Sequence, residues 1–356
     1  MLGLMTHEPD ASARSFRILA WPRERSRNIY THDLYRHVEA LGATSASVRE
    51  YRVGRGWRHR SDIVHMHWPE IACDPAPTWK AAGKAGIVVA DLLACRLRGA
   101  RIVRTQHDSG SHEQIHPRLE RWYTTVLRRL TGGVIHLSRA AADVDTRDRA
   151  IPTRVIPLGP PSTPSDLPDK AEARRRLNLP GGVLLATVGR LQRYKQIPAL
   201  IDEFVRSERT DAHLLIAGEV PDPSEADAIQ RAASRSDRVI FRPGWLEEAD
   251  FHLYLRAADV VVLAYADHLN SGVALFSLGA GTPVSVSDSP AIRELQSRFG
   301  DGWVRIIPTP VDPDTLEGLI SWATSEAERP PIGFTSWNEI ASDTMTFYEE
   351  IIDGTA

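Results

Sequence analysis

The sequence is poor in cysteine and lysine and has no long apolar run. Its 356 residues include two cysteines, Cys73 and Cys95. Their spacing suits no metal site, which excludes a disulfide-rich framework and disfavours zinc and redox chemistry. No apolar run reaches the roughly 18 residues of a membrane-spanning helix, and no basic-then-apolar signal opens the chain. We therefore expect a cytoplasmic protein.

Two common nucleotide-binding motifs are also missing. No strand pattern is followed by GxGxxG, and GxxxxGK[ST] does not occur. Dinucleotide dehydrogenases and P-loop kinases are therefore disfavoured. The composition is that of an average soluble protein, and the length predicts two domains of roughly 150 residues each.

Charge is distributed unevenly along the chain. Residues 1–160 carry 25 Lys and Arg against 16 Asp and Glu, whereas residues 161–356 carry 18 against 30. The basic half indicates an anionic partner, either a phosphorylated acceptor or a membrane surface, although arginines that solvate helix faces explain it equally well. Since no nucleic-acid-binding motif accompanies this charge, we expect no nucleic-acid partner.

Short apolar runs alternate with amphipathic stretches in both halves, which predicts an α/β fold with two doubly wound parallel sheets and a ligand cleft between the domains. We expect an N-terminal domain at 1–160, a proline-rich linker at 161–170, a C-terminal domain at 171–335 and a terminal helix at 336–356, which can pack back on the N-terminal domain. In the second half, helices are predicted at residues 197–207, 224–234, 247–258 and 272–280. Three glycines follow predicted helices as left-handed caps: Gly42, Gly99 and Gly132.

Two segments of the second half suit a phosphate group. In TVGRLQRYK, a strand ends at Gly189 and is followed by Arg190 and Lys195, two cations that can neutralise a pyrophosphate. The alternative for Lys195 is an ordinary surface lysine. In the second segment, the Asn270-Ser271-Gly272 loop opens a helix whose free N–H groups can bind phosphate.

The order TVGRLQRYK, LLIAG, VIFRPGWLEEADFHLYLRAADVVVLAY and NSGVALFSLGAGTPV resembles the donor domain of GT-B glycosyltransferases. It is most similar to the GT4-type family and to bacterial exopolysaccharide and lipid-linked β-mannosyltransferases. The segments IYTHDLYRHVEALG, DIVHMHWPE, IVRTQHDSGSHE and VIPLG resemble their acceptor domain. The resemblance implies a nucleotide-diphosphate sugar as donor and a hydroxyl group as acceptor, with no bound cofactor and no metal.

The same resemblance implies roles for individual residues. The donor diphosphate would be held by Gly189, Arg190, Lys195, Asn270, Ser271 and Gly272. Gly218 would end the strand under the nucleotide, and Trp245 and Leu246 would touch the base. His107 would lie under the transferred sugar.

The sequence departs from this family at a pair of glutamates. Retaining members carry two glutamates eight residues apart, where this chain has His268 and Phe276. Ribose recognition would then move to Ser277 or to the backbone. Inversion and retention of the anomeric configuration both stay open.

An inverting enzyme would need a general base on the acceptor side. Asp108 and Glu113 are the candidates, and turn chemistry is the alternative role for Asp108. His67, Trp68 and Glu70 are expected to line the acceptor pocket, with Trp68 either a sugar-stacking plane or a structural residue. His65 and His67 alternate on one strand face, but no third metal ligand is identifiable.

The basic amphipathic segment RLERWYTTVLRRL can lie on an anionic membrane, although a core-facing helix with solvated arginines is the stronger alternative. We therefore expect a hexosyltransferase, with GDP-mannose as one candidate donor, and allow a peripheral location on the inner face of the membrane. The alternatives are a sugar-nucleotide epimerase, a phosphorylase and a catalytically idle binding protein.

Overall fold

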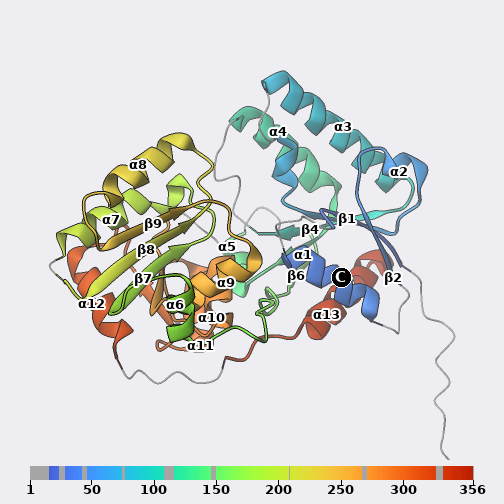
Figure 1. Cartoon of the computed structure of the whole chain (residues 1–356). Coiled ribbons are helices and arrows are strands. Elements are labelled where there is room, and N and C mark those ends of the chain that lie inside the picture. The colour runs from blue at the N-terminus through green and yellow to red at the C-terminus, as the bar shows by residue number, and fades with distance from the viewer. Residues whose placement is uncertain are drawn as a thin grey trace, which may run out of the picture. The chain divides into compact units, whose positions relative to one another are not determined.

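The computed structural model describes residues 16–23, 29–41, 46–73, 77–107, 116–145, 150–207, 209–266, 271–325 and 332–355 (Figure 1). The chain divides into two compact units. Unit 1 consists of Met1–Gly159 and Thr335–Ala356, and unit 2 is Pro160–Phe334. The terminal helix thus belongs with the first half of the sequence.

Unit 1 is built on a six-stranded parallel sheet with the order β2-β1-β3-β4-β5-β6. Its elements are β1 (Phe16–Trp21), α1 (Ile29–Ala40), β2 (Ala46–Glu50), α2 (Arg55–Arg58), β3 (Ile63–His67), η1 (Pro69–Cys73), α3 (Thr78–Leu97), β4 (Arg101–Gln106), α4 (Pro117–Leu130), β5 (Thr131–His136), α5 (Arg139–Val144), β6 (Thr153–Val155) and α13 (Trp337–Asp353).

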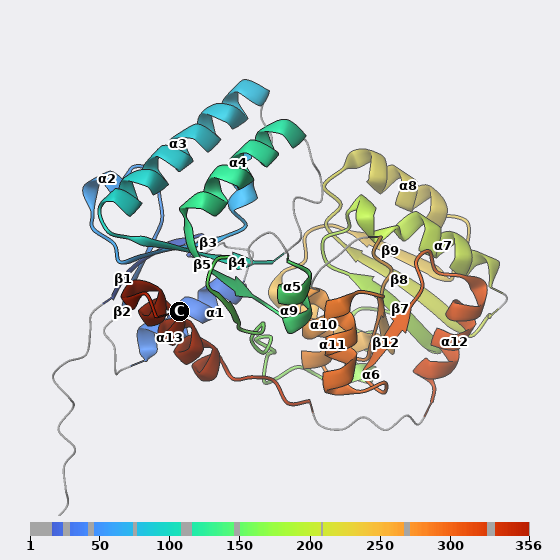
Figure 2. The same ribbon diagram turned by 180° about the vertical axis from the view of Figure 1, so that it is seen from behind.

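Helices cover both faces of the unit 1 sheet (Figures 1 and 2). Because strand side chains alternate between faces, Val64 and Met66 of β3 enter the core beneath α3 and α4, while Ile63 enters the core beneath α1 and α13. His65 and His67 share the second face with Ile63. This alternation places the two histidines, which are fully buried, in the layer beneath α1 and α13.

Unit 2 has a second six-stranded parallel sheet, with the order β12-β11-β10-β7-β8-β9. Its elements are α6 (Lys170–Arg176), β7 (Val183–Val188), η2 (Arg193–Lys195), α7 (Ile197–Arg206), β8 (Ala212–Gly218), α8 (Pro223–Ala233), β9 (Val239–Pro243), α9 (Glu248–Ala257), β10 (Val260–Leu263), α10 (Gly272–Gly279), β11 (Val284–Ser287), α11 (Pro290–Phe299), β12 (Val304–Ile307) and α12 (Pro313–Ala323).

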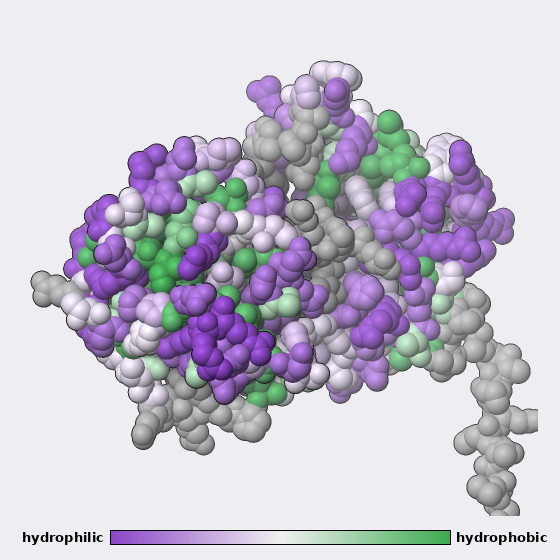
Figure 3. Space-filling view, viewed as in Figure 1, coloured by the Kyte–Doolittle hydropathy of each residue, from purple (hydrophilic) through white to green (hydrophobic). Residues whose placement is uncertain are grey.

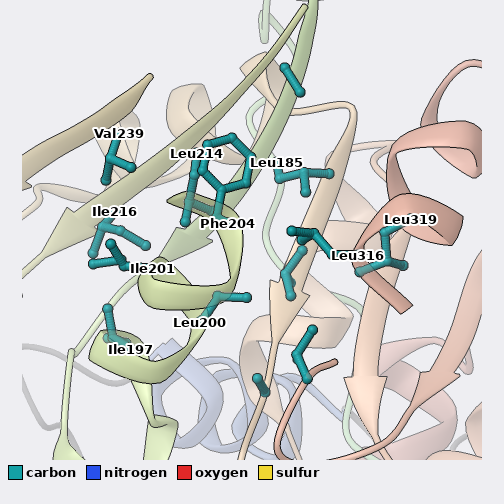
Figure 4. Close-up of a cluster of buried hydrophobic side chains, with 14 of the residues drawn as sticks. Leu185, Ile197, Leu200, Ile201, Phe204, Leu214, Ile216, Val239, Leu316 and Leu319 are labelled. Atoms are coloured by element: carbon teal, nitrogen blue, oxygen red, sulfur yellow. The ribbon is translucent and has the colours of Figure 1, made fainter. Parts of the chain in front are cut away.

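Each face of the unit 2 sheet has its own apolar core. Helices α7, α8 and α12 pack over one face, where Phe204 lies among Leu185, Leu214 and Ile216 (Figure 4). Helices α6, α9, α10 and α11 pack over the other. The prediction of two doubly wound α/β sheets is confirmed. Parallel strands direct their carboxyl ends to one edge, where ligands bind in such folds.

One capping prediction is wrong. Gly99 follows α3 with φ of +96°, as expected for a left-handed cap. Gly132 instead lies inside β5, because α4 passes directly into the strand at Thr131, whose backbone is extended. Gly42 lies outside the described residues.

Candidate active site

Strands β7 and β8 approach each other closely where they end. Gly189 donates from its N–H to the carbonyl of Ala217 at 2.9 Å, and Gly244 donates to the carbonyl of Gly218 at 2.9 Å. Gly189 has φ of +106° and Gly218 has φ of +145°. A Cβ added to Gly218 would lie 1.7 Å from the carbonyl oxygen of Gly189. Only glycine at position 218 permits this backbone contact.

Lys195, which follows Gly189 in the sequence, is buried. The residue is 3% exposed, and its Nζ lies 5.3 Å from the ring centroid of Tyr265. Burial lowers the pKa of the ammonium group to about 8. Among the described residues no carboxylate forms an ion pair with it. A buried cation without a counter-charge favours an anionic ligand.

Arg190 has a different environment, although it was predicted to act with Lys195. Its side chain is 60% exposed, and its Nε lies 3.9 Å from a carboxylate oxygen of Glu219. At this distance and exposure the ion pair is weak, so the guanidinium can exchange partners at little cost. Its role in binding a diphosphate stays a prediction.

The N-terminus of α10 lies beside Gly189. A Cβ added to Gly189 would lie 3.6 Å from Cγ2 of Val273, and a Cβ added to Gly272 would meet no atom within 4 Å. Ser271 caps the helix, its hydroxyl accepting from the N–H of Ala274 at 3.3 Å. Ser271 also hydrogen-bonds Tyr265, whose ring lies against Lys195. The helix terminus and the buried ammonium are therefore linked through one tyrosine.

The loop after β9 carries the residues expected at the nucleotide base. Gly244 ties this loop to Gly218 through its N–H. Trp245 is 46% exposed, and its indole N–H donates to Glu247 at 3.1 Å. Leu246 is half-buried against the unit 2 core. Trp245 thus offers an aromatic surface beside the ends of β8 and β9.

Of the two positions that replace the family glutamates, the structure describes Phe276, which is apolar. Phe276 packs with its ring centroid 5.5 Å from that of Phe251 and 5.6 Å from that of His252. Ser277 is fully buried and donates its hydroxyl to the carbonyl of Thr282 at 2.9 Å. Because this hydroxyl points inward and is already bonded, the prediction that Ser277 binds ribose is wrong for this conformation. His268 lies outside the described residues.

In unit 1, His107 follows β4 and contacts His67 at the end of β3. Nδ1 of His67 lies 3.0 Å from Nε2 of His107, and Nε2 of His67 lies 2.7 Å from the Tyr35 hydroxyl. Burial lowers the pKa of His107 to about 3 and that of His67 well below its ordinary value, so both rings are neutral at pH 7. No group of three metal-ligating side chains occurs in the described ranges.

Trp68 fixes the plane of the His107 ring. Their centroids are 3.9 Å apart and their planes meet at 21°. The backbone of Trp68 has φ of +49°, a left-handed conformation that costs roughly 1–2 kcal/mol for a residue with a Cβ. The stacked face of Trp68 is therefore covered by His107 and is not available to a sugar.

The structure brings some of the predicted site residues together, whereas others lie outside the described residues. It brings His67, Trp68 and His107 together in unit 1, and it brings Gly189, Gly218, Lys195, Ser271 and Gly272 to one edge of the unit 2 sheet. Glu70 lies half-buried in η1. Asp108, Glu113 and Asn270 lie outside the described residues. Sequence reasoning missed Tyr35, Tyr265 and Tyr348, which no local motif marks.

The profile of a protein family described as "Glycosyl transferases group 1" matches residues 182–321. The chain is 25% identical over 306 residues to the GDP-mannose:glycolipid 4-beta-D-mannosyltransferase of Xanthomonas campestris pv. campestris, which covers 83% of this chain and 82% of that protein. The matched family region contains both strand-end glycines and the α10 N-terminus.

Solved structures share the fold at low sequence identity. Sucrose-phosphate synthase from Thermosynechococcus elongatus has a TM-score of 0.66 and 18% identity, covering 96% of this chain and 100% of that one. Anabaena HepE in complex with UDP-glucose has a TM-score of 0.62 and 16% identity, covering 95% and 99%. Both similarities identify the two-domain GT-B architecture.

Proposed function

We propose that this chain, a group 1 glycosyltransferase of GT-B fold, transfers mannose from GDP-mannose to a hydroxyl group of a lipid-linked saccharide. The similarity to a mannosyltransferase over 83% of the chain supports the donor and the acceptor class. One structural observation carries the proposal. Lys195 is buried, has no carboxylate partner among the described residues, and is linked through Tyr265 to the N-terminus of α10 in the matched domain.

The diphosphate would bind where these two positive features meet. Lys195 supplies an ammonium group, and the first N–H groups of α10 supply unpaired donors and the positive end of the helix dipole. Gly272 leaves open space for a phosphate to approach. Arg190, Asn270 and Ser271 would complete the contacts to the diphosphate, and Trp245 and Leu246 would contact the base above Gly218. Because protein cations neutralise the leaving group, we expect transfer without a metal ion.

A β-linked mannoside made from GDP-mannose, an α-linked donor, would require inversion and therefore a general base. Asp108 is the first candidate and Glu113 the alternative, since both follow the strand that ends beside His107. We place His107 under the transferred sugar. Among the predicted acceptor-side residues, the buried His67 would act through His107, whereas Trp68 and Glu70 are partly exposed.

We further propose that unit 1 docks on an anionic membrane surface through α3, which supports a lipid-linked acceptor. Trp79 is 71% exposed, Ile87 57% and Leu97 80%, and Leu93 is exposed on the same stripe. Figure 3 shows hydrophobic residues gathered over this part of unit 1. The one acidic residue of α3, Asp91, is buried, and the exposed cations near the stripe are Lys80, Lys84, Arg96 and Arg98.

This combination of exposed apolar residues and cations suits anionic lipid rather than a protein partner. No helix among the described residues is long and apolar enough to cross a bilayer. Helix α4, for which a membrane surface was the weaker of two alternatives, directs Tyr123 and Leu127 into the core and exposes Trp122. The surface that we propose is therefore mainly α3.

The test is transfer of radiolabelled sugar to lipid-linked saccharides, using the purified full chain with GDP-mannose, UDP-glucose, dTDP-glucose and ADP-glucose. We expect product with GDP-mannose and thermal stabilisation by GDP, since a ligand at 100 times its dissociation constant adds about 2.7 kcal/mol to the free energy of unfolding. Lys195→Met should abolish both effects.

Other results would overturn parts of this proposal. Selective stabilisation by another nucleotide would keep a glycosyltransferase but replace the donor. Turnover of the sugar nucleotide without an acceptor would favour an epimerase. No stabilisation by any nucleotide, with acceptors present, would favour an idle binding protein.

A further inference from the structure

A chain of buried hydroxyl and imidazole groups runs behind His107. Nδ1 of His65 lies 2.6 Å from the hydroxyl of Tyr348 and 2.9 Å from the hydroxyl of Tyr35. The Tyr35 hydroxyl also lies 2.7 Å from Nε2 of His67, whose Nδ1 lies 3.0 Å from Nε2 of His107. Nε2 of His65 lies 2.8 Å from the Thr105 hydroxyl. Four elements, α1, β3, β4 and α13, thus meet at His65.

The hydroxyl and imidazole groups of this hydrogen-bonded series are all neutral. Burial raises the pKa of Tyr35 and Tyr348 and lowers the pKa of His65 to about 3. The tyrosines therefore keep their protons, and each imidazole carries one proton on one of its two nitrogens. A neutral imidazole that accepts at one nitrogen must donate at the other. The direction of one hydrogen bond to an imidazole ring therefore sets the direction of the next one along the series.

The two hydroxyls at His65 decide the direction. If Nδ1 of His65 carries no proton, its single lone pair accepts one strong hydrogen bond, and Tyr348 makes the shorter contact. If Nδ1 carries the proton, it donates to the hydroxyl oxygens and accepts from neither. In neither case does the Tyr35 proton go to His65. The remaining acceptors are the hydroxyl oxygen of Tyr348, which also hydrogen-bonds Tyr35, and Nε2 of His67 at 2.7 Å. Because an imidazole nitrogen is a stronger acceptor than a phenol oxygen, the Tyr35 proton is directed to Nε2 of His67.

We infer that Tyr35, held in this direction by Tyr348 and His65, fixes His107 as the tautomer that carries its proton on Nδ1. The steps follow from the contacts. His67 accepts from Tyr35 at Nε2 and therefore donates from Nδ1 to Nε2 of His107. His107 then keeps its own proton on Nδ1. Stacking against Trp68 holds the plane of the ring in which that proton lies.

This inference defines what His107 does at the site and rests on the proposed function for its placement under the sugar. His107 would be a hydrogen-bond donor to the transferred sugar and not the base that deprotonates the acceptor. The base would then be Asp108 or Glu113. Tyr35 and Tyr348 are positioning residues, because they act through His65, His67 and His107.

The tautomer can be read directly from histidine side-chain ¹⁵N NMR spectra of the full chain, since protonated and unprotonated imidazole nitrogens have widely separated shifts. His107→Asn identifies the signals of His107 by their loss. We expect a protonated Nδ1 and an unprotonated Nε2. In Tyr35→Phe, which removes the proton source, both tautomers of His107 should be populated.

Two further variants sharpen the test. Tyr348→Phe frees Nδ1 of His65 to accept from Tyr35, so the His107 tautomer should shift partly although Tyr348 bonds His65 rather than His67. Tyr123→Phe is the matched control. Tyr123 is equally buried in unit 1 but lies in the core beneath α3 and α4, and its hydroxyl has no hydrogen-bond partner within the described residues.

Kinetics distinguish positioning from a merely structural role. For Tyr35→Phe we expect kcat to fall at least tenfold with the KM for GDP-mannose changed less than threefold, a smaller fall for Tyr348→Phe, and no change for Tyr123→Phe. A proton on Nε2 of wild-type His107, or identical His107 spectra in Tyr35→Phe and Tyr123→Phe, would overturn the inference. If GDP-mannose gives no product, the proposed function fails while the spectra still decide the tautomer.

Discussion

The hydroxyl of Tyr348 lies 2.6 Å from Nδ1 of His65, although 283 positions separate the two residues in the sequence. Helix α13 therefore completes the core of unit 1, although all of unit 2 separates it in the sequence from the rest of unit 1. Ile340, Met345, Phe347 and Tyr348 lie in the same apolar cluster as Phe16 and Ile18 of β1. Packing of α13 thus contributes to the stability of unit 1.

Phe347→Ala should destabilise unit 1. The ring is buried against Gly133 and Arg154, and loss of a buried phenylalanine typically costs about 3–5 kcal/mol. Urea denaturation followed by circular dichroism measures the change. Ser342→Ala, on the exposed face of α13, is the control and should change the free energy of unfolding by less than about 0.5 kcal/mol. Equal changes in the free energy of unfolding for the two variants would contradict the packing of Phe347 in the unit 1 core.

Gly218→Ala should prevent normal folding of unit 2. Its methyl group would lie 1.7 Å from the carbonyl oxygen of Gly189, so β7 and β8 would have to separate where they end. The position also has φ of +145°. We expect little soluble protein or a greatly lowered Tm by differential scanning calorimetry. A variant with wild-type Tm would show that this strand contact is not required.

Gly272→Ala should instead fold normally and bind the donor poorly. Its methyl group meets no protein atom within 4 Å, but it enters the space where a phosphate would approach α10. We expect an unchanged Tm and a dissociation constant for GDP raised about tenfold, by isothermal titration calorimetry. Gly318→Ala, in α12, is also sterically free and should leave GDP binding unchanged. Unaltered binding in both variants would remove α10 from the phosphate site.

Lys195→Met should remove donor binding. It should also remove a contribution to the free energy of unfolding that rises with pH in the wild-type protein. Burial lowers the pKa of Lys195 from 10.5 to about 8 in the folded protein. Between these pH values the unfolded chain binds more protons, so the contribution of Lys195 to the free energy of unfolding rises with pH. The rise is on the order of 3 kcal/mol. Above pH 8, GDP affinity should fall because the ammonium form is lost.

The measurement compares wild type with Lys195→Met in urea denaturation from pH 7.5 to 10. The difference in unfolding free energy between the two proteins isolates Lys195, since all other groups titrate in both. A difference that does not change with pH would mean that Lys195 keeps an ordinary pKa.

Ile87→Glu should weaken binding to anionic vesicles. The side chain lies on the exposed apolar stripe of α3, where a carboxylate would be buried in lipid and repelled by its charge. In vesicle flotation we expect wild type to bind phosphatidylglycerol-containing vesicles and the variant to bind at least tenfold less. Trp245→Glu alters an exposed aromatic residue of unit 2 and should bind like wild type. If the wild type bound neutral vesicles as well as it binds phosphatidylglycerol-containing vesicles, an electrostatic contribution would be contradicted.

Local patterns predicted the elements of unit 2 closely. Helices expected at 197–207 and 247–258 occur as Ile197–Arg206 and Glu248–Ala257, because periodic apolar residues and caps act within a few turns. The rule failed at Gly132. A glycine after a helical pattern predicts a cap, but the pairing of Thr131 with Ile102 of β4 draws the chain directly into a strand.

The sequence by itself determined the two parallel α/β sheets, the strand-end glycines, the cation Lys195 and the shared face of His65 and His67, because each depends on residue type and short spacing. The tertiary structure alone decided that Ser277 bonds inward, that Lys195 is buried against Tyr265, and that Tyr35 and Tyr348 meet at His65. These contacts join residues from different elements, and only packing of the sheet against its helices brings their atoms within bonding distance.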